Sequence, residues 1–139
     1  FDAIIYENNI ELNTNIQKNL FINADKESIK KLFSILIDNA IKYNNENGKI
    51  NIDLINEKNK VKITIKNTGC GIPKEDLDRI FERFYRVDSS RDRKTGGYGL
   101  GLSIANSIVK QHNGKIYAKS IENQETSFII KLPLKKQGS

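Results

Sequence analysis

The sequence is poor in the residues that build disulfides and metal centres, with one cysteine and one histidine in 139 residues. A single cysteine cannot form an intramolecular disulfide, and it favours a reducing compartment. Cys70 has no histidine near it to activate the thiol, so we interpret it as a small packing residue. His112 has no second histidine, cysteine pair or spaced acidic cluster to complete a structural zinc site. We expect it to be a surface residue at a helix end, favoured by the helix dipole.

Long hydrophobic runs are also missing. No apolar stretch approaches the roughly 18 residues of a membrane-spanning helix, and no basic-then-apolar leader opens the chain. The chain begins at Phe1 instead of a methionine, so we expect a piece of a longer protein whose membrane anchors lie outside it. The mass of 15.9 kDa fits one domain, residues 1–139, with a core from about 11 to 134.

The net charge is +6 and the pI is near 9.4, a balance that suits polyanionic ligands. The lysines are scattered along the chain, as on a solvated surface, whereas all five arginines fall between Arg79 and Arg93. The planar guanidinium suits phosphate recognition better than an ammonium point charge does. Aromatic residues make up only 8% of the sequence, so we expect no nucleic-acid partner.

Hydrophobic periodicity predicts an α+β protein: a two-layer α/β sandwich whose mixed, mostly antiparallel sheet packs against three helices. The first helix has Asp25 as its N-cap, and Pro73 opens the second, whose inner face includes Phe84. The predicted helices are Ser28–Tyr43, a short one after Pro73, and Leu100–Gln111; the predicted strands are Ile50–Leu54, Val61–Ile65, Ile116–Ile121 and Phe128–Leu134. The polar, basic, glycine-ended segment Asp88–Gly97 is predicted to be a mobile loop.

The tetrapeptide Asn-Gly-Lys-Ile occurs twice, at residues 47–50 and 113–116, each time where a helix stops and a strand starts. We interpret Gly48 and Gly114 as glycine C-caps.

Three clusters of residues could form a binding or catalytic site. The first lies at the end of the first predicted helix. Asn39 and Lys42 are three residues apart and lie on one helical face. They lie beside the apolar stripe of the helix and are not part of it. An amide oxygen and an ammonium together suit a metal ion and the phosphates that it bridges. Taken alone, the pair is also typical of an ordinary solvated helix edge.

The other two clusters are rich in glycine. Residues 67–73, Asn-Thr-Gly-Cys-Gly-Ile-Pro, follow a strand, and the two glycines let the backbone turn sharply or touch a flat ligand. Residues 96–102, Gly-Gly-Tyr-Gly-Leu-Gly-Leu, lead from the arginine-rich loop into a helix, whose free N–H groups can hold an anion. This arrangement differs from a Rossmann or a Walker loop, and it predicts a phosphate grip covered by a lid.

In this order and spacing, the clusters resemble the catalytic and ATP-binding domain of the sensor histidine kinases of two-component systems, in the GHKL ATPase superfamily. The resemblance covers about Glu11 to Leu134 and implies the GHKL, or Bergerat, ATP-binding fold. Four stretches match family motifs: 38–43 the N box, 67–73 the G1 box, 80–88 the F box and 97–104 the G2 box.

The resemblance implies a protein histidine kinase that uses ATP and Mg²⁺. By it, Asn39 ligates Mg²⁺, Lys42 reaches a terminal phosphate, and Asn67 hydrogen-bonds the adenine amino group. Arg86 and Arg91 stabilise charge on the γ-phosphate. The catalytic candidates that the resemblance implies are Asn39, Lys42, Arg86 and Arg91. The remaining nucleotide-binding candidates are Tyr43, Gly69, Gly71, Ile72, Tyr85, Gly97, Tyr98, Gly99, Leu100, Gly101, Leu102 and Thr126.

The resemblance also implies partners. Members of the family phosphorylate a histidine on a separate dimeric helical hairpin, the dimerisation and phosphoacceptor domain, which this chain lacks. His112 matches a segment just after the G2 box and is therefore not that acceptor. We expect the F-box region, with Phe84 and Tyr85, to dock the hairpin, and a cognate response regulator to receive the phosphoryl group. The isolated domain is expected to be monomeric and cytoplasmic, in a parent protein anchored in the cell membrane.

Three positions depart from the family pattern. Asn67 stands where Asp is usual, so its NH₂ group must find a partner other than the adenine. Ile35 stands where many members carry a polar residue, and Glu125 where glycine is common. Ile35 and Asn67 favour one alternative, a nucleotide-binding module without transferase activity. Two others stay open: another GHKL ATPase or a protein serine kinase, and a basic DNA-binding domain.

Overall fold

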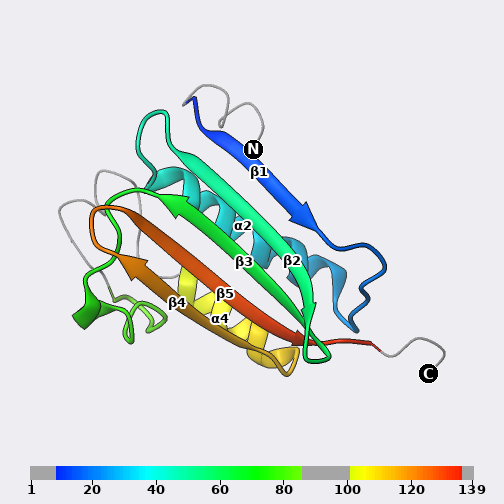
Figure 1. Cartoon of the computed structure of the whole chain (residues 1–139). Coiled ribbons are helices and arrows are strands. Elements are labelled where there is room, and N and C mark those ends of the chain that lie inside the picture. The colour runs from blue at the N-terminus through cyan, green and yellow to red at the C-terminus, as the bar shows by residue number, and fades with distance from the viewer. Residues whose placement is uncertain (1–8, 86–100, 136–139) are drawn as a thin grey trace.

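The computed structural model describes residues 9–85 and 101–135 as a five-stranded sheet with helices on one side (Figure 1). The strand order is β1-β2-β3-β5-β4; β1 is parallel to β2, and the other neighbours are antiparallel. The elements are β1 (Glu11–Ile16), α2 (Lys26–Lys42), β2 (Lys49–Glu57), β3 (Lys60–Thr68), a 3-10 turn (Lys74–Asp76), α4 (Gly101–Gln111), β4 (Lys115–Ile121) and β5 (Glu125–Pro133). The predicted α+β two-layer sandwich with a mixed sheet is confirmed.

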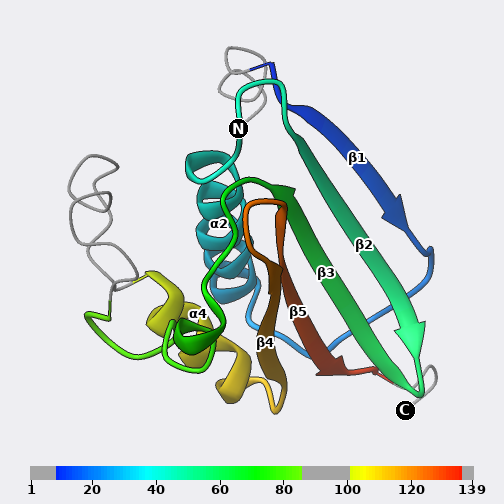
Figure 2. The ribbon, with the colours of Figure 1, turned by 60° about the vertical axis from the view of Figure 1, so that its left-hand side comes forward.

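The core lies between the sheet and helices α2 and α4, which cover the same face (Figure 2). Alternate residues of β3 and β5 point inward because strand side chains alternate between faces. Leu32 and Leu36 of α2 meet this surface and are fully buried. Among the described residues, no helix is long and apolar enough to cross a membrane.

Helix α2 begins as predicted at Asp25, whose carboxylate accepts hydrogen bonds from the hydroxyl (2.6 Å) and the backbone N–H (3.0 Å) of Ser28. These two bonds, the hydroxyl first, lower the pKa of Asp25 below its ordinary value. The cap therefore stabilises the fold more when the carboxylate is ionised than when it is protonated.

The structure corrects the prediction for His112, which is half-buried and joins the two helices. Its Nε2 accepts a hydrogen bond from the Asp25 backbone N–H at 3.1 Å, and its Nδ1 lies 2.7 Å from the Ile108 carbonyl oxygen. These partners assign the neutral tautomer with the proton on Nδ1. His112 thus ties the end of α4 to the start of α2 by hydrogen bonding.

The two Asn-Gly pairs are also corrected. The left-handed residues are Asn47 and Asn113, each with φ 61°, while neither following glycine has a positive φ. Both glycines are needed for close approach instead. A Cβ on Gly48 would clash with the side chain of Asn44, and one on Gly114 would lie 2.5 Å from a carbonyl oxygen of β5.

Where a short helix was predicted after Pro73, the structure has the 3-10 turn and further turns up to residue 84, so the described residues contain two α-helices. Ile80 is buried, and Phe81 packs edge-on against Phe128 with ring centroids 6.2 Å apart. Phe84 was predicted on the inner face, but it is 62% exposed with φ 68°. Its backbone leaves the helical region there and turns the ring outward. Strand β1 was not predicted.

We predict that the Asp25 cap makes stability fall in acid. The pKa of Asp25 is lower in the folded state than its unfolded value of 3.8. The ionised carboxylate therefore adds stability at pH values above 3.8, and this stability is lost as the pH falls through the folded-state pKa. Asp25→Ser keeps a capping oxygen but does not titrate. The wild type should melt a few degrees higher than Asp25→Ser at pH 7, and the two melting temperatures should converge in acid.

Ser28→Ala is the control, since it removes the hydroxyl that lowers the Asp25 pKa most. In the Ser28→Ala background, the melting-temperature difference between Asp25 and Ser at position 25 should depend less on pH. A gap between wild type and Asp25→Ser that stays constant from pH 7 to pH 2.5 would contradict the cap's role; that pH range is chosen to span roughly the ordinary carboxyl titration.

Candidate functional site

The last turn of α2 carries the first predicted cluster. Asn39 is half-buried, and its carbonyl oxygen accepts the capping N–H of Tyr43 at 3.1 Å. The Nζ of Lys42 lies 3.1 Å from the Asp38 carboxylate, with both side chains more than a third exposed. Exposed ion pairs contribute little free energy, so breaking this one to reach a ligand costs little.

The ends of β3 and β5 bring two buried polar side chains together. Asn67 and Thr126 are 4% and 6% exposed, the only buried polar residues in the described part of the chain. They pair across the two strands, so both side chains lie on the helix-covered face. The Asn67 Nδ2 donates to the Thr68 carbonyl oxygen at 2.8 Å. The NH₂ group of Asn67 therefore has the separate partner that the sequence required, and its Oδ1 is left as the acceptor.

The glycine turn after β3 is packed tightly against its neighbours. Gly69 has φ 149°, and a Cβ there would clash with the carbonyl oxygen of Tyr43. Gly71 has φ 74°, and a Cβ there would lie 2.7 Å from the Ile121 carbonyl oxygen. No other residue type fits either position, because the space and the backbone conformation both exclude a side chain. The turn therefore joins the end of α2 to the β4–β5 hairpin.

The next residue of the turn is held by a hydroxyl. The backbone N–H of Ile72 donates to the Ser120 Oγ at 2.7 Å, and that hydroxyl donates onward to the Glu125 carbonyl oxygen at 2.9 Å. Thr126 Oγ1 lies 3.3 Å from the same Ser120 oxygen. Ser120 was missed by sequence reasoning, because its contacts join segments about fifty residues apart and leave no spacing signal.

The start of α4 lies against the middle of α2. A Cβ on Gly101 would be 3.4 Å from the Ile35 Cγ2, an ordinary contact, and Ile35 lies one turn before Asn39. Ile35 thus packs against the helix that follows the G2 box. Leu102 is half-buried against the core. The predicted site residues Arg86, Arg91, Gly97, Tyr98, Gly99 and Leu100, and the whole of the predicted loop, lie outside the described residues.

Tyr85 is bound within its own segment. Its hydroxyl donates to the Asp76 carboxylate, and the Arg79 guanidinium lies 4.4 Å from the ring centroid. The hydrogen bond to Asp76, together with partial burial, raises the pKa of the Tyr85 phenol. Contact between Tyr85 and a nucleotide stays a prediction.

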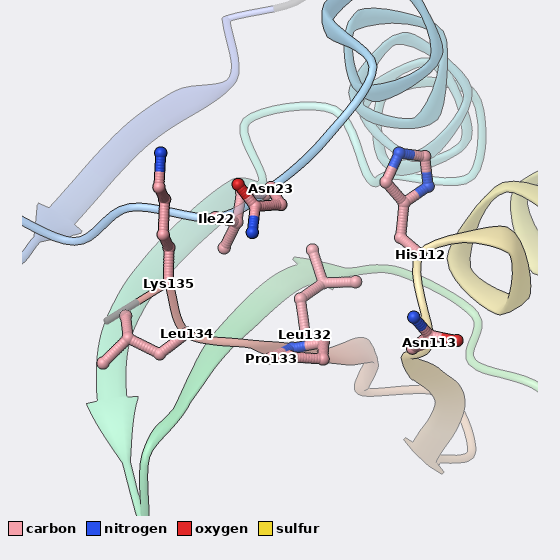
Figure 3. Close-up of a pocket in the computed structure, with 8 residues that line it drawn as sticks. All are labelled: Ile22, Asn23, His112, Asn113, Leu132, Pro133, Leu134 and Lys135. Carbon is pink, nitrogen blue, oxygen red and sulfur yellow. The ribbon is translucent and has the colours of Figure 1, made fainter. Parts of the chain in front are cut away.

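The described residues hold no group of three or more His, Cys, Asp or Glu side chains that could bind a metal ion. A cavity of about 130 Å³ opens beside His112, lined by Ile22, Asn23, His112, Asn113 and Leu132–Lys135 (Figure 3). It lies at the end of the sheet opposite Asn67, because β5 runs from Glu125 beside the glycine turn to Pro133 at the cavity. It contains none of the predicted site residues.

The described residues define a class of protein: a sheet-and-helix sandwich with buried amide and hydroxyl groups and a glycine turn gathered at one end. The family described as histidine kinase-, DNA gyrase B-, and HSP90-like ATPase matches residues 24–136. The chain belongs to this family. The resemblance predicted from the four motifs is thereby confirmed.

Known relatives lie among the histidine kinases. Sensor histidine kinase WalK of Bacillus subtilis (strain 168) is 40% identical over 134 residues, which are 94% of this chain and 22% of that protein. The nucleotide-free catalytic domain of histidine kinase ThkA matches with a TM-score of 0.83 at 34% identity, over 96% of this chain and 86% of that one. The structure of ThkA in complex with response regulator protein TrrA matches with a TM-score of 0.80 at 31% identity, over 100% of this chain and 38% of that chain. The chain thus spans about a fifth of WalK's length.

We predict that Gly69→Ala disables the site. The new methyl group clashes with the Tyr43 carbonyl, so the turn must move away from α2. Affinity for a fluorescent ATP analogue should fall about tenfold or more. Gly114→Ala is the matched control, since its Cβ also meets a backbone carbonyl, at 2.5 Å, but at the far end of the sheet. Both variants should melt lower than wild type, and equal nucleotide affinities in the two would contradict the prediction.

Proposed function

We propose that this chain binds Mg-ATP and transfers the γ-phosphoryl group to a histidine on a separate dimerisation and phosphoacceptor hairpin, as the catalytic domain of a two-component sensor kinase. The observation that carries this proposal is the meeting of three elements at one end of the sandwich. Asn39 comes from α2, Asn67 from β3 and Thr126 from β5, around a glycine turn that excludes side chains.

The base would bind at the strand ends. The Asn67 Oδ1 is an acceptor suited to the adenine amino group, because Nδ2 already donates to the backbone. Thr126 lies beside it and would contact the adenine edge. Gly69 and Gly71 leave a floor without side chains, on which Ile72 and Tyr43 would pack against the base or ribose.

The phosphates would extend along the end of α2 toward the start of α4. The amide oxygen of Asn39 is the hard oxygen ligand that Mg²⁺ prefers, and the bound ion would neutralise charge on the phosphates. Lys42 would turn from Asp38 to a terminal phosphate. Phosphoryl transfer depends mainly on positioning and charge stabilisation. Arg86, Arg91 and the glycines of the G2 box would complete that charge stabilisation.

Partners are proposed on the same basis. Phe84, 62% exposed with the Arg83 guanidinium 5.0 Å from its ring centroid, offers apolar area for the hairpin. ThkA was solved with the response regulator protein TrrA, which supports a response regulator as the next acceptor. We further propose that the domain by itself is monomeric, and that it works in the cytoplasm as part of a membrane-anchored parent.

One observation favours a second candidate, a nucleotide-binding module without transferase activity. Ile35 packs on Gly101 where many family members carry a polar residue, so Asn39 would be left to hold the metal with the phosphates alone. Incubation with γ-labelled ATP and a separately made hairpin separates the candidates. Label on the hairpin histidine supports the kinase; tight ATP binding with no label supports the module; label on serine supports a serine kinase.

We predict that Asn39→Asp weakens Mg-ATP binding about tenfold, because the added carboxylate charge repels the phosphates beside the metal. The domain should not unfold, because the residue lies off the buried stripe of α2. Asn51→Asp is the matched control, a half-buried asparagine on β2 whose cross-strand partner is Lys66. Calorimetry with ATP and magnesium measures the affinity, and thermal melting measures the fold. Unchanged affinity in Asn39→Asp at an unchanged melting temperature would contradict the metal role.

A further inference from the structure

The segment after the N box and the strand before the G1 turn are joined by two side chains that sequence reasoning did not single out. Asn44 follows the C-cap of α2, and Thr68 is the last residue of β3. The Thr68 hydroxyl donates to the Asn44 Oδ1 at 2.6 Å. The two residues are 24 positions apart, and this bond connects the residue just after the N box to the G1 box.

Both side chains also hold the start of β2. The Lys49 backbone N–H donates to the Thr68 Oγ1 at 2.8 Å, and the Asn44 Nδ2 donates to the Lys49 carbonyl oxygen at 3.1 Å. The Asn44 Oδ1 accepts a further bond from the Asn45 backbone N–H at 2.8 Å. Both ends of the Asn44 amide are therefore engaged, and its orientation is fixed by three partners.

The glycine at position 48 belongs to this arrangement. A Cβ there would clash with both the Asn44 Oδ1 and the Thr68 Oγ1. Gly48 is buried and has an ordinary backbone conformation, so it is glycine because the two side chains occupy the space beside it. A side chain at position 48, just before β2, would thus displace the hydrogen-bonded pair.

The position of the pair gives it a consequence beyond stability. Asn44 lies next to Tyr43, whose carbonyl the Gly69 turn touches, and Thr68 lies between Asn67 and Gly69. Any change in the Asn44–Thr68 distance moves the end of α2 relative to the base site. This side-chain bond links the proposed phosphate side of the site to its proposed base side.

We infer that Asn44 and Thr68 are positioning residues that set the separation between Asn39 and Asn67. The inference rests on the proposed function. A ligand that spans both sides, Mg-ATP, should depend on this separation, whereas adenosine, which reaches only the base side, should not.

Thr68→Val tests the inference, because valine keeps the shape and β-propensity of threonine but cannot form the bond. We expect Mg-ATP affinity to fall about tenfold and adenosine affinity to change less than about threefold. Thr68→Ser restores the hydroxyl and should recover Mg-ATP binding. Asn44→Ala removes the same bond from the other side and should reproduce the selective loss.

Gln17→Ala is the matched control. The Gln17 Oε1 accepts the Asn56 backbone N–H at 3.0 Å near the opposite end of β2, so its loss also removes a side-chain bond to that strand. If Gln17→Ala weakens Mg-ATP as much as Thr68→Val, or if Thr68→Val weakens adenosine and Mg-ATP equally, the inference is overturned. If the wild type itself binds neither ligand, the proposed function fails, and the inference fails with it.

Discussion

The contact between the Tyr43 carbonyl and Gly69 is the constraint on which the rest of the site depends. Two backbone segments from different layers of the sandwich approach so closely that no side chain fits between them. Strand register then places Asn67 opposite Thr126, and helix periodicity places Asn39 just before the contact. The geometry of the candidate site is therefore set by backbone contacts between the ends of these elements.

Helix α2 is fixed at both ends by side-chain bonds to distant segments. At its start, His112 reaches Asp25 from the end of α4, and just beyond its end Asn44 reaches Thr68 of β3. Lys42, between these anchors, makes an exposed ion pair with Asp38. The frame is therefore rigid while the long cationic side chain stays free to change partner, which suits a residue that would follow a phosphate.

Local pattern was enough to predict much of the fold. The apolar spacing of α2 and its Asp25 cap predicted that helix to within two residues, and α4 to within one. Apolar spacing and capping residues are signals that come from residues close together in the sequence. Strand β1 was missed although Leu12 and Ile16 fall on one face of an alternating pattern, because two apolar residues in six make that pattern weak.

What the sequence could not predict depends on contacts between segments far apart in the chain. The stretch after Pro73 has helical spacing, yet its backbone leaves the helix so that Phe81 can pack on Phe128 of β5. Gly48 and Gly114 looked like helix caps, but their small size serves neighbours that only the folded chain brings close. The motif residues were singled out by their fixed spacing, and their roles stay predictions, whereas the residues proposed to position them left no such signal in the sequence.

The departure at Asn67 is best understood in the same terms. Its Nδ2 donates to the carbonyl oxygen of the next residue at 2.8 Å, a position where either oxygen of the family's usual Asp would face another oxygen. The amide resolves this by pointing its donor at the backbone and its acceptor away. The Thr68 backbone carbonyl thus sets the orientation of the Asn67 amide, while the Thr68 side chain makes the bond to Asn44. The proposed recognition of the base and the proposed positioning bond would therefore depend on consecutive residues of one strand.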